Sequence, residues 1–152
     1  MLNKLILSVT LAALLPLTVQ AADLDRHYVE APQPASGMAP PFSEAVTVGD
    51  TVYVAGHLGL DPKTSKVPES AETEARLVLD AVKHTVEAAG LHMDDLVSVT
   101  VYCTDLSLYD TFNGVYRTYF HDHYPARAFI GVAQLVRGAR IEVAAIAVKR
   151  AH

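Results

Sequence analysis

The chain has 152 residues, of which 51% are hydrophobic, a formal net charge of −5 and a single cysteine. An acidic chain repels phosphate backbones, which argues against nucleic acid as a partner, and one cysteine cannot form an intrachain disulfide. The length fits one ordinary domain, stabilised by its own core or by contacts between subunits.

The first 21 residues have the features of a secretory signal peptide. Lys4 provides a short positive start, an apolar stretch runs from Leu5 to Val19, and small residues favour cleavage after Ala21. A membrane anchor is the alternative, but a span needs roughly 20 apolar residues. We therefore expect a periplasmic or secreted protein with no membrane attachment after cleavage. Its mature domain, 22–152, would carry 11 basic and 17 acidic residues, a net charge of −6.

The segments before the first helix are rich in β-formers and turn residues. Residues 23–41 are rich in Pro, Ala and Gly, which indicates an irregular lead-in with one short strand near Tyr28. Two β-rich runs, 45–48 and 51–55, are separated by a Gly-Asp pair, so we predict a hairpin with a two-residue turn. A polar loop is expected over residues 56–68.

The middle of the chain alternates between helical and strand patterns. Apolar residues recur at helical spacing over 72–89, and charged residues, including Glu74, are assigned to the remaining surface of that helix. Residues 96–104 alternate as a strand whose apolar face begins at Val97. A second amphipathic helix is predicted over 106–120.

Two strands, 127–132 and 139–148, close the chain and give the order ββαβαββ. This order predicts an α+β sheet with both helices packed on one face. The last strand is apolar on both sides, since Ile141, Val143, Ala145 and Ala147 alternate with Ala144, Ile146 and Val148. Two helices cover only one face of a sheet, so we predict that another subunit covers the second face.

Two charged side chains in apolar strands are the candidates for chemistry. Arg127 opens a strand directly after Pro125, where a guanidinium offers a fork of donors suited to a carboxylate; a solvated strand end is the alternative. Glu142 lies within an apolar run and would either reach a cleft or form a salt bridge at its rim. The pair His121 and His123 lacks a third ligand at recognised zinc spacing, so no metal site is predicted.

Six segments carry a family resemblance, in the order 39–45, 52–57, 60–62, 112–116, 125–127 and 141–147. Together they resemble the Rid family of reactive intermediate deaminases, also called the YjgF family. The resemblance implies a chorismate-mutase-like fold and a homotrimer whose sheets form a central barrel, with sites in the three clefts between subunits. It further implies hydrolysis of imines and enamines such as 2-aminoacrylate to 2-keto acids and ammonia, without a cofactor.

The resemblance also implies roles for individual residues. Arg127 would bind the substrate carboxylate, Glu142 would orient the attacking water, and the backbone at Phe129 would bind the nitrogen end of the substrate. Asn113, within a matching segment, and Tyr124, beside another, are expected to line the same small-molecule site.

Three positions depart from the family pattern. Phe42, which we place among the substrate-binding residues, stands where active members carry a tyrosine; Ala55 replaces a serine, and His57 a glutamine. Two hydroxyls are thereby lost, and Tyr124 is a nearby source of one. Two hypotheses follow: a deaminase of low or altered specificity, or a non-catalytic binding protein for a small carboxylate. Ribonuclease activity, also attached to the family, fits poorly with an acidic, exported chain.

Overall fold

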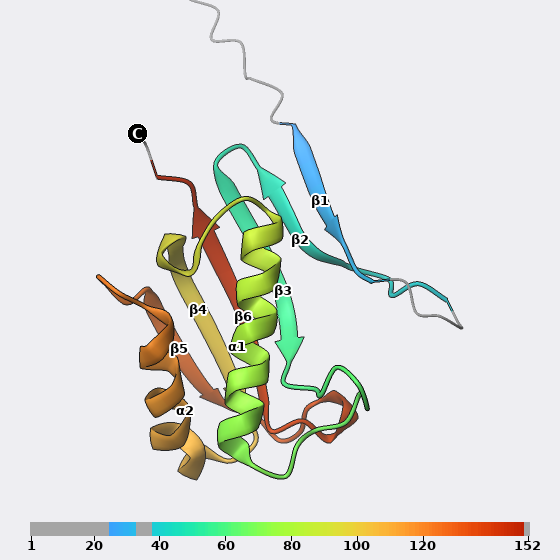
Figure 1. Cartoon of the computed structure of the whole chain (residues 1–152), viewed down its shortest axis with the longest axis vertical. Helices are drawn as coiled ribbons and strands as arrows, with labels where there is room; N and C mark the ends of the chain where they lie inside the picture. The colour runs from blue at the N-terminus through green and yellow to red at the C-terminus, as the bar shows by residue number, and fades with distance from the viewer. Residues whose placement is uncertain (1–24, 33–37, 151–152) are drawn as a thin grey trace, which may run out of the picture.

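The computed structural model describes residues 25–32 and 38–150 (Figure 1). Its strands and helices are β1 (Arg26–Glu30), β2 (Ser43–Val48), β3 (Thr51–Leu58), α1 (Ala71–Ala88), β4 (Leu96–Cys103), α2 (Tyr109–Tyr116), β5 (Ala126–Gly131) and β6 (Ile141–Val148). The predicted ββαβαββ order is confirmed for β2 to β6, and β1 is the short strand expected near Tyr28. The predicted signal peptide, 1–21, lies outside the described residues. Within the described ranges, no helix is both long and apolar enough to cross a bilayer.

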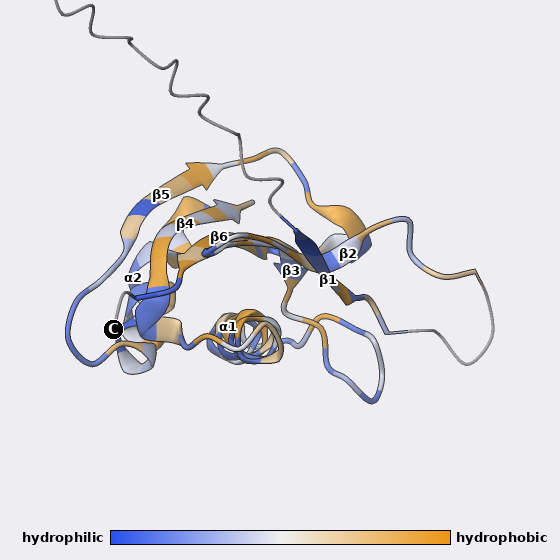
Figure 2. Ribbon diagram, turned by 90° about the horizontal axis from the view of Figure 1, so that it is seen from above, coloured by the Kyte–Doolittle hydropathy of each residue, from blue (hydrophilic) through white to orange (hydrophobic). Residues whose placement is uncertain are grey.

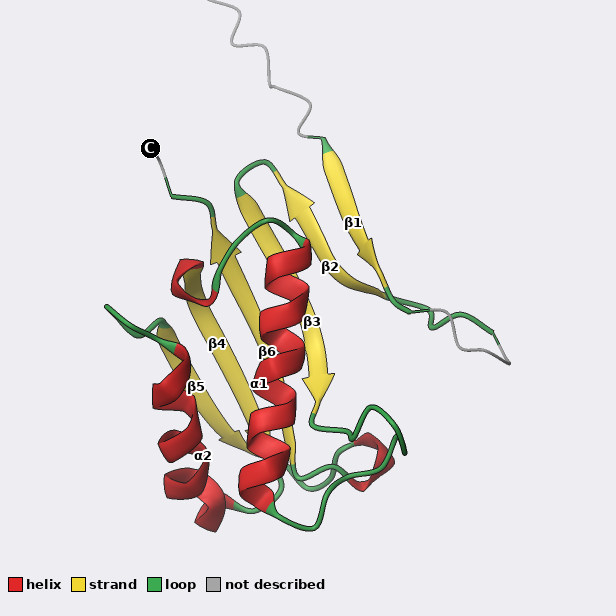
Figure 3. Ribbon diagram, viewed as in Figure 1, coloured by secondary structure: helices red, strands yellow, loops and turns green. Residues whose placement is uncertain are grey.

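All six strands form one sheet in the order β1-β2-β3-β6-β4-β5 (Figure 3). Every neighbouring pair is antiparallel except β4 and β5, which are parallel. Both helices cover the same face of the sheet, and Figure 2 shows the opposite face, here called the open face, without a helix. The predicted α+β class is therefore confirmed.

The core lies between the helices and the sheet. Alternation along β6 buries Ile141, Val143, Ala145 and Ala147 and leaves Glu142, Ala144, Ile146 and Val148 half-buried on the open face. The buried β6 residues pack with the apolar stripe of α1, which includes Val78, Leu79, Val82 and Val86. The second predicted helix is also confirmed, since two 3₁₀ turns, Leu106–Leu108 and Arg117–Tyr119, extend α2 at its ends.

Glu74 does not lie on the surface, as its charge and helical position predicted, but is completely buried. Its carboxylate accepts hydrogen bonds from the backbone N–H groups of Arg140 (2.6 Å) and Ile141 (3.1 Å) and from Arg140 Nε (2.6 Å). A buried carboxylate is tolerated when it is paired and its lone pairs are satisfied. Glu74 therefore joins the first turn of α1 to the start of β6.

Two predictions about strands were wrong because the pairing register shifts. Val97 is 47% exposed, since a shift between Leu96 and Ser98 in the pairing of β4 with β6 lets Leu96 enter the core instead. The loop predicted from residue 56 begins three residues later, after Leu58, because β3 resumes pairing with β6 after a shift between Val54 and His57. His57 is consequently part of the sheet. Such bulges redirect side chains that simple alternation would place on the other face.

Candidate functional site

Arg127 lies on β5, which is an edge strand of the sheet. It pairs in register with Val99 of β4, and Phe129 pairs with Val101. Both valines are buried under the helices, and adjacent residues of paired strands point to the same face. Arg127 and Phe129 therefore point toward α2, so Arg127 is not an ordinary solvated strand end.

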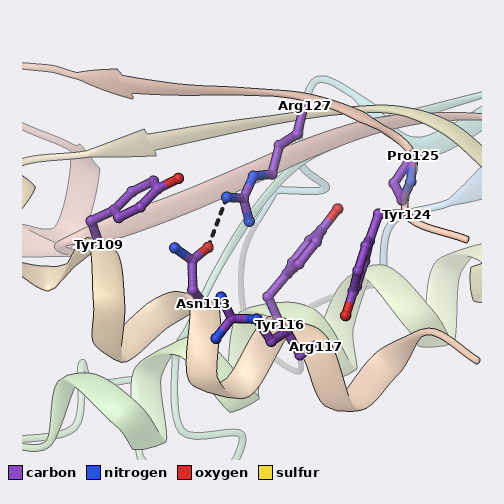
Figure 4. A pocket seen from close by; sticks show the side chains of 7 residues that line it. All are labelled: Tyr109, Asn113, Tyr116, Arg117, Tyr124, Pro125 and Arg127. Carbon is purple, nitrogen blue, oxygen red and sulfur yellow. Dashed lines mark hydrogen bonds between the residues drawn. The ribbon is translucent and has the colours of Figure 1, made fainter.

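Four aromatic rings surround the Arg127 guanidinium. Its central carbon lies 4.5 Å from the ring centroid of Tyr116, 5.8 Å from those of Tyr109 and Phe112, and 5.9 Å from that of Phe129. All four distances fall within the roughly 6 Å range of cation–π attraction. Nη2 also donates to Asn113 Oδ1 at 2.7 Å (Figure 4). These contacts fix the guanidinium while leaving donors for a ligand.

A cavity of about 340 Å³ opens beside this guanidinium (Figure 4). Its lining residues are Tyr109, Asn113, Tyr116, Arg117, Tyr124, Pro125 and Arg127. The volume is near the lower end for ligand sites, which span roughly 300–1,000 Å³. The lining holds two arginines and no carboxylate, so the cavity, hereafter the arginine pocket, is positively charged in an otherwise acidic chain and suits an anionic ligand.

The hydroxyl of Tyr116 is a buried polar group of the arginine pocket that lacks a hydrogen-bond partner among the residues that the structure describes. Burial raises the pKa of Tyr116 to about 12, against the opposing effect of the nearby Arg127 charge. The phenol therefore stays protonated at neutral pH. A buried polar group without a partner calls for an explanation, and a ligand in the adjoining cavity would provide one.

The sequence prediction placed Asn113, Tyr124 and Arg127 in one site, and the structure brings these three together. It missed Tyr109, Tyr116 and Arg117, which also line the pocket. The sequence contained a signal for these residues: positions 109, 113, 116 and 117 follow helical spacing and so share one face of the predicted helix with Asn113. Phe129, also expected at the site, is not among the lining residues; its ring packs 5.1 Å from that of Tyr109 and 5.6 Å from that of Phe112.

Glu142 lies on the open face, away from the arginine pocket. Its neighbours along β6, Ile141 and Val143, are buried on the helix face, so its own side chain points the opposite way. The carboxylate lies against Gly56 of β3, in the space that a Cβ at position 56 would need. Within one chain, Arg127 and Glu142 are thus on opposite faces of the sheet and do not meet.

The positions that depart from the family pattern lie outside the arginine pocket. Phe42 precedes β2 and is 54% exposed. His57 is buried and joins three elements: its Nδ1 is 3.2 Å from Glu44 Oε2 on β2, and its Nε2 is 3.1 Å from Thr85 Oγ1 on α1. Burial lowers the pKa of His57, although Glu44 acts in the opposite direction. These contacts give His57 a structural role.

Within residues 25–32 and 38–150, no three His, Cys, Asp or Glu side chains are grouped to hold a metal ion. His121 instead contacts a carboxylate, with Nδ1 3.1 Å from Asp94 Oδ2.

Comparison with known proteins gives consistent matches. The family model for Endoribonuclease L-PSP matches residues 32–149. The 2-iminobutanoate/2-iminopropanoate deaminase of Escherichia coli strain K12 is 40% identical over 113 residues, which are 72% of this chain and 88% of that protein. The crystal structure of E. coli TdcF with bound serine superposes with a TM-score of 0.73 at 35% identity, covering 82% of this chain and all of that one. The crystal structure of RidA from Psychrobacter sp. PAMC 21119 superposes with a TM-score of 0.70 at 36% identity, covering 81% of this chain and 97% of that one.

Proposed function

The chain belongs to the Endoribonuclease L-PSP family, also called YjgF or Rid, and from this membership we propose that it hydrolyses 2-imino and 2-enamino acids such as 2-aminoacrylate. The products are 2-keto acids and ammonia. One observation carries the proposal: the Arg127 guanidinium is held in place by aromatic rings and Asn113, beside a cavity without acidic residues. Such a group is a preorganised receptor for the carboxylate of a small imino acid.

In the proposed reaction, Arg127 binds the substrate carboxylate through donors that Asn113 does not use. The Tyr116 hydroxyl is a further donor next to the same guanidinium. Water then adds to the imine carbon, with Glu142 orienting it and accepting its proton, and the C–N bond breaks to release ammonia. Because imines hydrolyse readily, the main task of the protein is to position the substrate and the attacking water relative to each other. The reaction needs no cofactor.

The proposal requires more than one chain for each site. Arg127 and Glu142 lie on opposite faces of the sheet, so a substrate can meet both only where the arginine pocket of one subunit faces the open face of another. We therefore propose a homotrimer with three sites in the clefts between subunits. Support comes from exposed apolar side chains on strands outside the core, with Tyr53 at 50%, Val97 at 47% and Ile130 at 41% exposure.

The place of action is part of the proposal. The signal-like residues 1–21 favour a periplasmic or secreted protein, free of the membrane after cleavage, which meets its small carboxylate outside the cytoplasm. RNA cleavage, the activity in the family's name, is not what we propose. A net charge of −5 opposes the phosphate contacts on which nucleic-acid binding depends.

A second candidate function is binding of a small carboxylate without turnover. Phe42 and Ala55 favour it, because neither side chain has the hydroxyl that the corresponding tyrosine and serine would supply. The arginine pocket would remain intact in such a protein, since neither residue lines it.

The two candidates are separated by mixing the mature protein with freshly generated 2-aminoacrylate and measuring ammonia release above the buffer rate. For a deaminase, Glu142→Gln removes the excess rate but leaves keto-acid binding intact, because an amide cannot accept the proton from water. A wild-type rate equal to buffer, with binding retained, selects the binding protein.

Arg127→Lys tests the anchor common to both candidates. It keeps the charge but loses the bidentate fork, so calorimetric affinity for 2-ketobutyrate should fall by about 1.5–3 kcal/mol. Arg137→Lys is the matched control at an exposed turn outside the pocket. Equal affinities of the wild type and Arg127→Lys would remove Arg127 from the site.

A further inference from the structure

The arginine pocket contains a second guanidinium that the proposed reaction does not use. Arg117 begins the 3₁₀ turn after α2, one helical turn beyond Asn113. Arg117 lines the pocket from the helix side and Arg127 from the strand side (Figure 4). A monocarboxylic substrate such as 2-aminoacrylate has one negative group, which Arg127 alone satisfies. The second cation is therefore unexplained by that substrate.

Neither guanidinium is neutralised by the protein. Within the described ranges, Arg117 and Arg127 form no ion pair, and no carboxylate lines the pocket. Arg76, Arg140 and Arg150 do lie 3.4, 2.6 and 3.0 Å from carboxylate oxygens of Glu72, Glu74 and Asp95. Among the described residues, the exposed Arg26 and Arg137 are also unpaired, so what distinguishes Arg117 is that it lines the arginine pocket together with Arg127. Two like charges lining one small cavity repel each other, and a ligand with two negative groups would relieve that repulsion.

We infer that the substrate is a 2-imino dicarboxylic acid, with Arg127 on the carboxylate next to the imine and Arg117 on the distal carboxylate. The inference rests on the proposed function and assigns Arg117 as its specificity-determining residue. The chemistry is unchanged at the reacting carbon: water adds to the C=N bond, a C=O bond replaces it, and ammonia leaves, giving a 2-keto dicarboxylic acid. The distal carboxylate takes part only in binding.

The test compares two stable keto acids of equal chain length, 2-ketoglutarate and 2-ketopentanoate, which differ by the distal carboxylate. Calorimetry on the mature wild type should show about fivefold tighter binding of 2-ketoglutarate, the upper end of the effect expected for an ion pair at an exposed arginine such as Arg117. Arg117→Met should abolish that preference, mainly by weakening the binding of 2-ketoglutarate. Lys63→Met removes the same charge from an exposed loop outside the pocket and should retain the preference.

The outcomes separate this inference from the proposed function. Equal wild-type affinities for the two acids, or a preference that survives Arg117→Met, overturn the dicarboxylate inference. If Arg127→Lys still weakens both ligands in that case, the carboxylate anchor of the proposed function stands. If the wild type binds neither acid, both proposals fail. Ammonia release from the imine of glutamate, relative to that of norvaline, should show the same preference and the same loss in Arg117→Met.

Discussion

Replacing the buried carboxylate of Glu74 should strongly destabilise the protein. Glu74 has no exposed surface and accepts hydrogen bonds from the backbone of Arg140 and Ile141 and from the Arg140 side chain. Glu74→Leu fills much of the same volume but removes every acceptor. Because Glu142 follows directly after Ile141, the start of the strand that carries it loses its anchor on α1.

The size of the effect follows from what is left unpaired. Two backbone N–H groups lose their acceptor, and each buried unsatisfied group costs about 1–3 kcal/mol. The Arg140 side chain is 30% exposed, so its guanidinium regains water and adds less. We expect the free energy of unfolding to fall by about 3–5 kcal/mol, in line with breaking a buried pair from one side. Glu74→Gln retains one acceptor oxygen, so its free energy of unfolding should fall by less.

Urea unfolding at fixed protein concentration measures these differences, since the stability of the proposed trimer would depend on concentration. Glu72→Leu is the matched control on the same helix turn: its carboxylate is 65% exposed and pairs with Arg76 at 3.4 Å. It should change the free energy of unfolding by less than about 0.5 kcal/mol. If Glu74→Leu is no more destabilising than Glu72→Leu, the anchoring role assigned to the buried carboxylate is wrong.

Three further predictions concern pH, chemistry and assembly. Burial lowers the pKa of His57 in the folded state below the unfolded value of 6.5, so the unfolded state binds the proton first. Stability that is fully present above pH 6.5 is therefore lost as the pH falls from 6.5 through the lower folded-state pKa; His57→Gln should flatten this part of a urea-midpoint profile, and an unchanged profile would assign it to other groups. Phe42→Tyr should raise the rate of ammonia release from 2-aminoacrylate, whereas an unchanged rate would show that the missing phenol is not limiting. If the proposed trimer is assembled through the open face, Ile146→Asp should give a monomer by light scattering, because burying an unpaired carboxylate in that interface costs several kcal/mol; a retained trimer mass would place the interface elsewhere.

Local pattern predicted the elements well, and long-range contacts account for the errors. The apolar stripes of α1 and α2 and the alternation of β6 were all visible in the sequence. The burial of Glu74 was not, because its backbone donor at Arg140 is 66 positions away along the chain. The exposure of Val97 depends on a register shift, which is set when β4 pairs with β6 and leaves no mark in the alternation itself.

The site was predictable in part for the same reason. The strand pattern identified Arg127, and the family resemblance supported it and added Asn113. The spacing of residues 109, 113, 116 and 117, which places Arg117 in the pocket, lies beside the apolar stripe from which the helix was predicted. The face to which Arg127 points could not be read from β5 alone. Which of its residues point toward the helices is set by the parallel register in which β5 pairs with β4, and this pairing is a tertiary contact. The separation of Arg127 from Glu142 therefore emerged only in the folded chain.

The placement of Arg127 and Glu142 on opposite faces of one sheet has a genetic consequence. In a trimer with shared sites, two inactive variants, one altered at Arg127 and the other at Glu142, would complement each other when produced in the same cell. Random mixing at equal amounts would rebuild both halves in about one quarter of the clefts, because each cleft draws its arginine pocket and its carboxylate from different subunits. A chain holding a complete site on its own could show no such rescue, since every mixed subunit would still lack one of the two groups.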